Sequence, residues 1–148
     1  MNITSAFHGI RSLCIDSAPL IYALEKRAVY ITRMQVILDL IRKEPIQAFS
    51  ASIALSEVLV KPLQNQDTKT VAAYRQMLLH SRHFQLISIT PAIAEEAAAL
   101  RARYNLKTPD ALQIAVAVSQ RCDAFLTNDL GLKRVTEVQV LVLDELEV

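Results

Sequence analysis

A helix is predicted to begin in the stretch KTPDAL, residues 107–112, because a proline in the first helical turn loses no hydrogen bond and already has a helical φ. We expect this helix to reach about residue 121. The apolar run AFLT at 124–127 follows at once and predicts a strand that leads into Asn128 and Asp129. A helix followed directly by a short apolar strand is typical of α/β folds, in which ligands bind at the carboxyl ends of the strands.

The same alternation of strands and helices extends back to the start of the chain and on to its end. Short apolar runs predict further strands at 12–15, 46–49, 84–89 and 138–142. Apolar periodicity, caps and prolines predict helices at 19–26, 30–41, from Ser50 or Ser52 to near Pro62, 67–81 and 92–104. Strands joined by helical crossovers pair in parallel. We therefore expect an α/β fold of three layers (αβα) with a mainly parallel central sheet of about five strands.

Length and composition indicate one domain over residues 1–148, with residues 1–10 as an N-terminal extension that is either disordered or packed on a neighbour. The chain is 52% hydrophobic and 21% charged, which excludes an intrinsically disordered chain. Its net charge of +1 excludes a nucleic-acid partner held by bulk electrostatics alone but permits a local basic patch. Cys14 and Cys122 lack metal-ligand spacing and are interpreted as reduced core thiols. No secretory leader or membrane span is recognised, so we expect a cytoplasmic protein.

Four acidic residues lie at comparable ends of the predicted elements: Asp16, Glu57, Asp110 and Asp129. Three of them also have an ordinary structural explanation, since Asp16 and Asp129 suit turns and Asp110 favours the amino end of its helix. Glu57 is harder to explain in that way, because its neighbours are apolar and an unpaired buried carboxylate is costly. One divalent-metal site explains all four acids together, because Mg²⁺ and Mn²⁺ prefer oxygen ligands.

Other kinds of site find no support in the sequence. His8, His80 and His83 lack ligand spacing, and two glycines in the whole chain are too few for a dinucleotide-binding fingerprint. Asp16 has no neighbouring acid of the kind that a receiver domain or a haloacid-dehalogenase-like phosphatase needs. Metal-dependent chemistry is what remains.

Four motifs resemble those of the PIN-domain nucleases, and among these the small VapC-like toxins. They are Asp16 after an apolar strand, Ser56-Glu57 in a helix, TPDALQIA at 108–115 and AFLTND at 124–129. The resemblance spans residues 12–142 and implies a Mg²⁺- or Mn²⁺-dependent endoribonuclease that cleaves single-stranded or loop RNA by attack of a metal-activated water. It also implies that Asp16, Glu57, Asp110 and Asp129 are the catalytic residues and metal ligands, and it leaves open whether one metal ion or two are bound.

The resemblance further implies supporting residues and partners. Ser17 and Asn128 are expected to hydrogen-bond the ligands or the substrate. Arg101, Arg103 and Lys107 precede Asp110 and are expected to contact RNA phosphates weakly. A homodimer and an antitoxin protein are the expected protein partners.

Two alternatives stay open at this point. Apolar side chains such as Ile31, Val36 and Leu40 lie beside the main helical stripe, and they indicate either a helix face open to another chain or a well-filled core. A PIN fold kept as a non-cleaving scaffold that binds RNA or protein is the alternative function. The four acids argue against it, although a fold alone never establishes a function.

Overall fold

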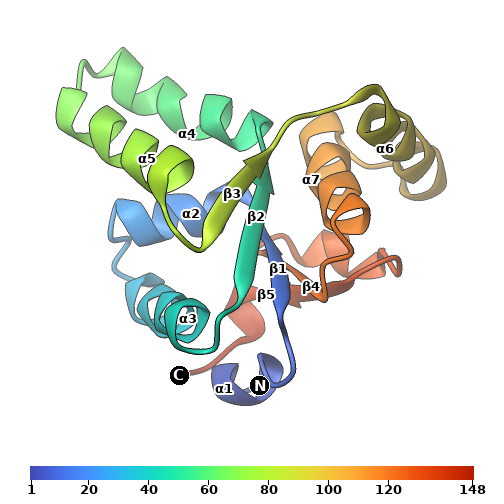
Figure 1. Cartoon of the computed structure of the whole chain (residues 1–148), viewed down its shortest axis with the longest axis horizontal. Coiled ribbons are helices and arrows are strands. Elements are labelled where there is room, and N and C mark those ends of the chain that lie inside the picture. Colours follow the sequence, from blue (N-terminus) through green and yellow to red (C-terminus); the bar gives the residue numbers. More distant parts are fainter.

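Five parallel strands form one central sheet in the computed structural model, which describes all of residues 1–148 (Figure 1). The strands are β1 (Ser12–Ile15), β2 (Gln47–Ala51), β3 (Phe84–Ile87), β4 (Ala124–Thr127) and β5 (Gln139–Val142). They lie in the order β3-β2-β1-β4-β5, and all pairings are parallel. Every strand therefore ends at the same edge of the sheet. The predicted parallel sheet of about five strands is confirmed.

Helices cover both faces of this sheet, as predicted for three layers. They are α1 (Ile3–Ala6), α2 (Ser17–Leu24), α3 (Ile31–Lys43), α4 (Ile53–Gln64), α5 (Thr68–His80), α6 (Pro91–Tyr104) and α7 (Thr108–Ser119), with short 3-10 turns at η1 (Leu130–Arg134) and η2 (Leu143–Glu145). Figure 1 shows α6 and α7 on one side of the sheet and α2 to α5 on the other. None of these helices has the length and apolar character needed to cross a membrane.

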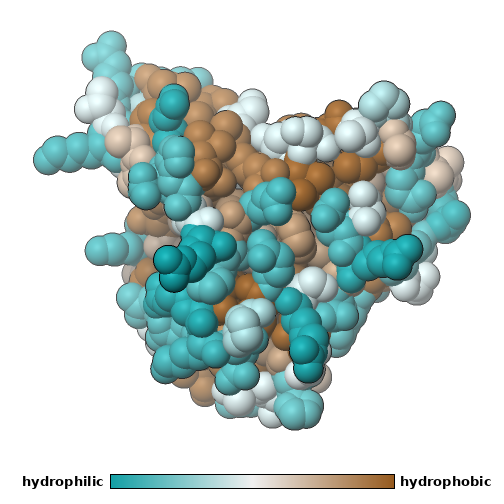
Figure 2. All heavy atoms as spheres, in the orientation of Figure 1, coloured by the Kyte–Doolittle hydropathy of each residue, from teal (hydrophilic) through white to brown (hydrophobic).

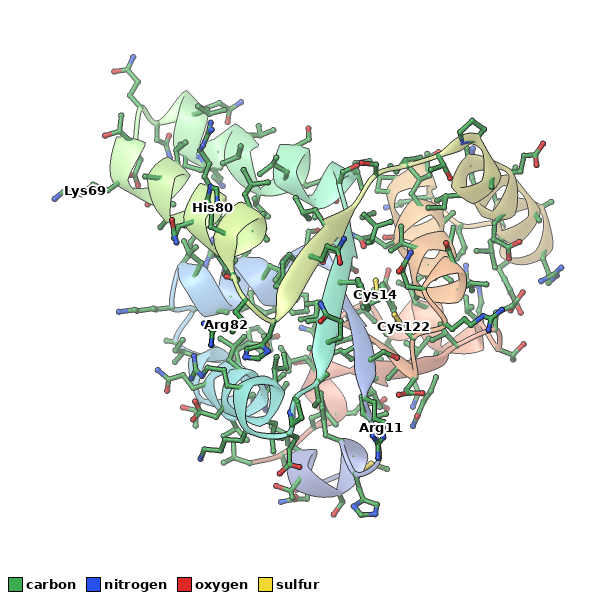
Figure 3. All side chains as sticks on the ribbon, viewed as in Figure 1. Arg11, Cys14, Lys69, His80, Arg82 and Cys122 are labelled. Atoms are coloured by element: carbon green, nitrogen blue, oxygen red, sulfur yellow. The ribbon has the colours of Figure 1, made fainter.

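The sheet separates two hydrophobic cores. Along β1, Leu13 and Ile15 point into the larger core and Cys14 into the smaller one. Cys122 packs against the same smaller core, and Figure 3 shows both cysteines on the α7 side; both thiols are free. Burial on both faces explains why the strands are continuous apolar runs rather than alternating ones.

Helix bounds differ from the prediction by a few residues, and two of these differences have a clear physical reason. The proline at 62 predicts the end of a helix, but α4 continues through it to Gln64. Pro62 lies in the last turn, where its missing N–H removes only one helical hydrogen bond, and its carbonyl accepts the Asp67 N–H (2.9 Å) that leads into α5. Helix α2 begins at Ser17, two residues before Pro19, because Asp16 acts as its N-cap.

The N-terminal extension has a structure that the sequence did not predict. Its first residues form α1, and the side chains of Ile3 and Phe7 are buried in the larger core. Asn2 pairs with Glu147 in a single parallel bridge, and the Ile3 N–H donates to the Glu147 carbonyl (2.8 Å). The extension is therefore ordered and packed on this chain's own C-terminal residues.

Candidate functional site

The four predicted acids come from elements that surround the carboxyl end of β1. Asp16 is the first residue after β1, and Asp129 is the second residue after β4, which pairs with β1 on one side. Glu57 lies in α4, which follows β2, the partner of β1 on the other side. Asp110 is the third residue of α7, which packs against β1 and β2. The strand order thus brings together what we call the acid cluster: Asp16, Glu57, Asp110 and Asp129.

Asp16 is held firmly by its surroundings. Its Oδ1 accepts the Ser17 N–H (2.8 Å), and its Oδ2 accepts the hydroxyl of Thr127 (2.9 Å). Its backbone N–H donates to the Leu126 carbonyl (2.9 Å), which extends the pairing of β1 with β4. Burial raises the pKa of Asp16, the two hydrogen bonds oppose that increase, and the negative charge of Asp129 adds to it.

Thr127 is a functional candidate that the sequence prediction missed. Its side chain is fully buried at the end of β4. While its hydroxyl donates to Asp16, its Oγ1 also accepts the Asp129 N–H (3.1 Å), and Asp129 Oδ1 in turn accepts the Gly131 N–H (2.9 Å). One hydroxyl therefore fixes the positions of two acids. A threonine two residues before an acid at a strand end is the only sequence signal for this role.

Glu57 and Asp110 interact with the other acids through their charges. Burial raises the pKa of Glu57, the negative charges of Asp16 and Asp110 raise it further, and the Ser17 hydroxyl lowers it. Burial also raises the pKa of Asp110, with further increases from Asp16 and Asp129. Such mutual shifts require the four carboxylates to be near neighbours.

The acid cluster is not a closed metal-binding group in this structure. No three His, Cys, Asp or Glu side chains are arranged closely enough to hold an ion. The chemistry of the cluster nevertheless suits a divalent cation, because none of its members forms an ion pair with a basic side chain. A cation would relieve the repulsion that, together with burial, raises the pKa values of Asp16, Glu57 and Asp110, and oxygen is the donor that Mg²⁺ and Mn²⁺ prefer. The residues therefore fit a divalent ion in charge and in donor type.

The two predicted supporting residues occupy different positions. Ser17 lies beside the acid cluster, where its N–H binds Asp16. Asn128 instead accepts the backbone N–H of Asp144 through its Oδ1 (2.9 Å), so its amide oxygen joins the end of β4 to the C-terminal turn η2. A direct role of Asn128 toward a ligand or substrate stays a prediction.

Of the three basic residues predicted to bind phosphate, only Lys107 influences the acid cluster, by lowering the pKa of Asp110. Arg103 forms an ion pair with Glu137, and the Arg101 Nε–H donates to the Leu106 carbonyl (3.1 Å). Arg134 also lowers the pKa of Asp110, and no sequence pattern identifies this residue. The cations nearest to Asp110 thus include one predicted residue and one unpredicted residue.

Gln113 connects the two helices that carry Glu57 and Asp110. It is fully buried one turn after Asp110, and its Oε1 accepts the N–H of Ala51 (3.0 Å), the last residue of β2 before α4. Its Nε2 has no hydrogen-bond partner. The sequence does not identify this residue, because a glutamine in a helix is usually a surface residue.

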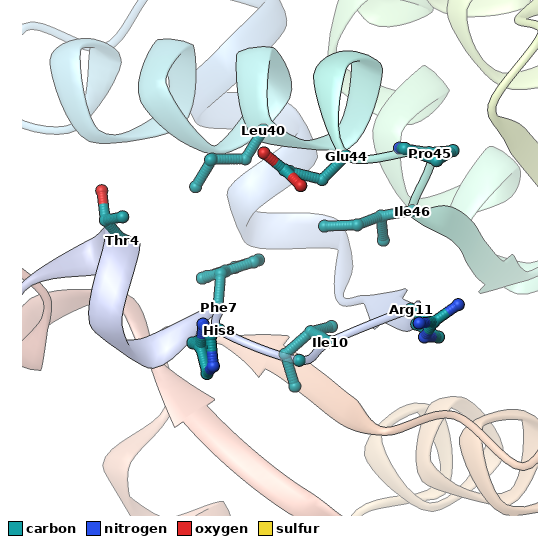
Figure 4. A pocket seen from close by; sticks show the side chains of 10 residues that line it. Thr4, Phe7, His8, Ile10, Arg11, Leu40, Glu44, Pro45 and Ile46 are labelled. Carbon is teal, nitrogen blue, oxygen red and sulfur yellow. The ribbon is translucent and has the colours of Figure 1, made fainter.

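One cavity of about 500 Å³ lies away from the acid cluster, at the opposite, amino edge of the sheet, between α1 and the end of α3 (Figure 4). Its lining includes Phe7, Ile10, Leu40, Glu44 and Ile46. We assign the functional site by the chemistry of the acids, because none of the four acids lines this cavity. Figure 2 shows a surface hollowed between the α4–α5 helices and the α6–α7 helices.

Comparison with known proteins identifies the family of this chain. The family model for the PIN domain matches residues 13–138. A toxin–antitoxin complex from Klebsiella pneumoniae is similar in structure, with a TM-score of 0.70, 25% identity, and coverage of 88% of this chain and 97% of that chain. The VapBC2 complex of Rickettsia felis, bound to a DNA fragment from its promoter, has a TM-score of 0.69, 15% identity, and coverage of 88% and 98%.

VapC20 of Mycobacterium tuberculosis, a toxin that cleaves the sarcin–ricin loop, has a TM-score of 0.66, 14% identity, and coverage of 86% of this chain and 98% of that chain. At 15% and 14% identity, the structures from Rickettsia felis and Mycobacterium tuberculosis show only that the fold is shared. No curated protein matches the sequence. The family match extends over most of the chain and includes all four acids, and the chain therefore belongs to the PIN-domain family.

Proposed function

We propose that this chain is a metal-dependent endoribonuclease that cleaves single-stranded or loop RNA. The observation that carries the proposal is the acid cluster, in which three carboxylates have raised pKa values and none has a basic partner. Unpaired, half-buried acids destabilise a fold, and titratable groups perturbed in this way gather at functional sites. The family match and the similar toxin structures support the same function.

The acid cluster would hold one or two Mg²⁺ or Mn²⁺ ions. A bound ion supplies a water of lowered pKa and neutralises the charge that gathers on the phosphate during in-line displacement. The protein contributes positioning: Thr127 and the Ser17 N–H fix both oxygens of Asp16, and the Gly131 N–H fixes Asp129. Hydrolysis by water would leave a 5′-phosphate and a 3′-hydroxyl.

An antitoxin protein is the partner that we infer from the similar toxin–antitoxin complexes. A cavity of about 360 Å³ between α2, α3 and α5 offers a place for a segment of it. Its floor includes Leu20, Leu38 and Met77, and its rim includes Arg42 and Arg82. This combination favours an apolar segment with acidic flanks. Calorimetric titration with an acidic amphipathic peptide should show weaker binding to Arg82→Glu than to the wild type, and equal binding would reject this surface.

A homodimer is the second assembly that we propose. Val36 and Leu40 of the predicted apolar stripe pack against the larger core, so α3 uses most of that surface internally. On α4, by contrast, Val60 and Leu63 are 51% and 59% exposed, and Figure 2 shows apolar surface over this part of the molecule. The apolar face open to a second copy is therefore on α4. A monomer mass by light scattering at micromolar concentration would remove this proposal.

Cleavage of a mixed-sequence single-stranded RNA tests the nuclease proposal. The purified protein would be incubated with Mg²⁺, with Mn²⁺ and with chelator, beside Asp110→Asn and the control Glu95→Gln. Glu95 is exposed on α6 and forms no ion pair, so the control makes the same change of charge away from the acids. We expect metal-dependent cleavage that Asp110→Asn loses and Glu95→Gln retains. Binding of RNA without cleavage under every condition would favour the scaffold alternative.

A further inference from the structure

Arg134 lies next to the acid cluster without being a partner of any acid in it. A Cβ added at Gly131 would lie 3.1 Å from Asp129 Oδ1 and 3.3 Å from Arg134 Nη1, so both atoms face the same point. Arg134 forms no ion pair with Asp129 or with any other acid. The guanidinium and the carboxylate therefore stand side by side, and Gly131 leaves the space between them open.

The guanidinium is fixed in place by two backbone carbonyls. Its Nη1 donates to the Gly131 carbonyl, and its Nη2 and Nε donate to the Tyr104 carbonyl at 2.8 and 3.3 Å. Tyr104 is the last residue of α6, and its hydroxyl is held in turn by Glu137 Oε1 (2.5 Å). Arg134 is therefore anchored to two separate elements, although it is exposed to solvent.

These contacts leave part of the guanidinium free. An arginine has five N–H groups in one plane, and the three contacts use one on each nitrogen. One N–H therefore remains on Nη1 and one on Nη2, and each can donate a charge-assisted hydrogen bond to a phosphate oxygen. A cap at the end of α6 explains the hydrogen bonds from Arg134 to Tyr104. It does not explain why two N–H groups of Arg134 stay free beside the carboxylate of Asp129.

We infer that Arg134 binds a backbone phosphate of an RNA strand lying across the acid cluster, and that Gly131, which lacks a side chain, leaves the guanidinium and Asp129 undisturbed beside it. The inference rests on the proposed nuclease function and names a substrate contact for it. It also replaces Arg103, which is occupied by Glu137, as the arginine that meets the substrate. Arg134 lowers the pKa of Asp110, but it forms no ion pair that would compete with a phosphate for its free N–H groups.

Steady-state cleavage and RNA binding in chelator test the inference. Arg134→Gln should raise KM several-fold, and it should reduce the slope of log Kd against log salt by about 0.7, the value for one phosphate contact on a single strand. Gly131→Ala keeps every charge, and it should raise KM because its methyl lies 3.3 Å from Arg134 Nη1 and 3.1 Å from Asp129 Oδ1 and presses on both. Arg75→Gln is the control for net charge, because Arg75 is exposed on α5 and forms no ion pair.

The outcomes separate this inference from the proposed function. If the wild type neither binds nor cleaves RNA, the proposed function fails and this inference fails with it. If the wild type does both, and a folded Arg134→Gln keeps the wild-type KM and salt slope, only the inference about Arg134 is overturned. Should Arg134→Gln not fold, a wild-type KM in both Arg134→Lys and Gly131→Ala overturns it equally, since lysine lacks the planar donor fork of the guanidinium and alanine presses on it.

Discussion

Replacement of Thr127 by valine tests how the fold holds Asp16. Valine has nearly the shape of threonine but lacks the hydroxyl that donates to Asp16 Oδ2 (2.9 Å) and accepts the Asp129 N–H (3.1 Å). A hydrogen bond to a charged group contributes roughly 1.5–3 kcal/mol, and one between neutral groups about 1 kcal/mol. We therefore expect Thr127→Val to lower the free energy of unfolding by roughly 2–4 kcal/mol and the Tm by on the order of 10 °C.

This loss of stability should depend on pH, because the missing hydroxyl mainly supports the charged carboxylate. Burial raises the pKa of Asp16 above its ordinary 3.8, so the folded protein holds this proton more tightly than the unfolded chain. The stability that comes from Asp16 is thus fully present below pH 3.8 and is lost as the pH rises through the folded-state pKa. Valine raises the pKa of Asp16 further. The difference in unfolding free energy between the wild type and Thr127→Val should therefore grow as the pH rises from about 4 to about 7.

Urea denaturation in chelator, at about pH 4 and about pH 7.5, measures both effects. Thr127→Ser is the matched control, because serine keeps the hydroxyl and loses only a methyl group. Equal stability of the valine and serine variants at neutral pH would show that the hydroxyl contributes nothing. The claim that the Thr127 hydroxyl stabilises the charged Asp16 would then be wrong.

Other residues give predictions that need simpler assays. Asp110→Asn should raise the Tm of the metal-free protein, because it removes a half-buried charge that Asp16 and Asp129 repel. An unchanged or lower Tm, measured by scanning fluorimetry, would contradict this prediction. Ile3→Ala should cost roughly 2–5 kcal/mol of unfolding free energy, because Ile3 is fully buried, whereas a frayed extension would tolerate it. Burial raises the pKa of Cys122 to about 12, so its modification by a thiol reagent near neutral pH should be much slower in folded protein than in urea.

The central strands could be predicted from the sequence because burial on both faces makes them plain apolar runs. Both β1 and β4 have the predicted bounds. The prediction ended β2 too early, since Ser50 interrupts the apolar pattern. In the structure Ser50 is fully buried and its hydroxyl donates to the Ile15 carbonyl, so a polar residue stays inside the strand. A rule based on apolar runs cannot anticipate a partner on another strand.

Asp16, Asp110 and Asp129 could be selected because each stands at or near an end of an element, where sequence signals are strongest, whereas Glu57 lies inside α4 and could be selected by its apolar neighbours. Thr127, Gln113 and Arg134 could not, because their roles depend on which elements become neighbours. Thr127 meets Asp16 only because β4 pairs with β1, and Arg134 meets Tyr104 only because η1 returns to the end of α6. Contacts of this kind follow from strand order and register, which the pattern of one sequence does not determine.

The acids also differ in how far an ordinary structural role explains them. Asp16 caps α2 and receives the Thr127 hydroxyl, so its structural explanation and its proposed metal role hold together. The Asp110 side chain forms no hydrogen bond or ion pair within the chain, and its charge is favoured only by the dipole of α7 and by the nearby charges of Lys107 and Arg134. Substitution of Asp16 would therefore disturb a helix cap and a buried hydrogen bond as well as any metal site. Substitution of Asp110 removes little besides the charge, and that makes it the more informative residue for a test of function.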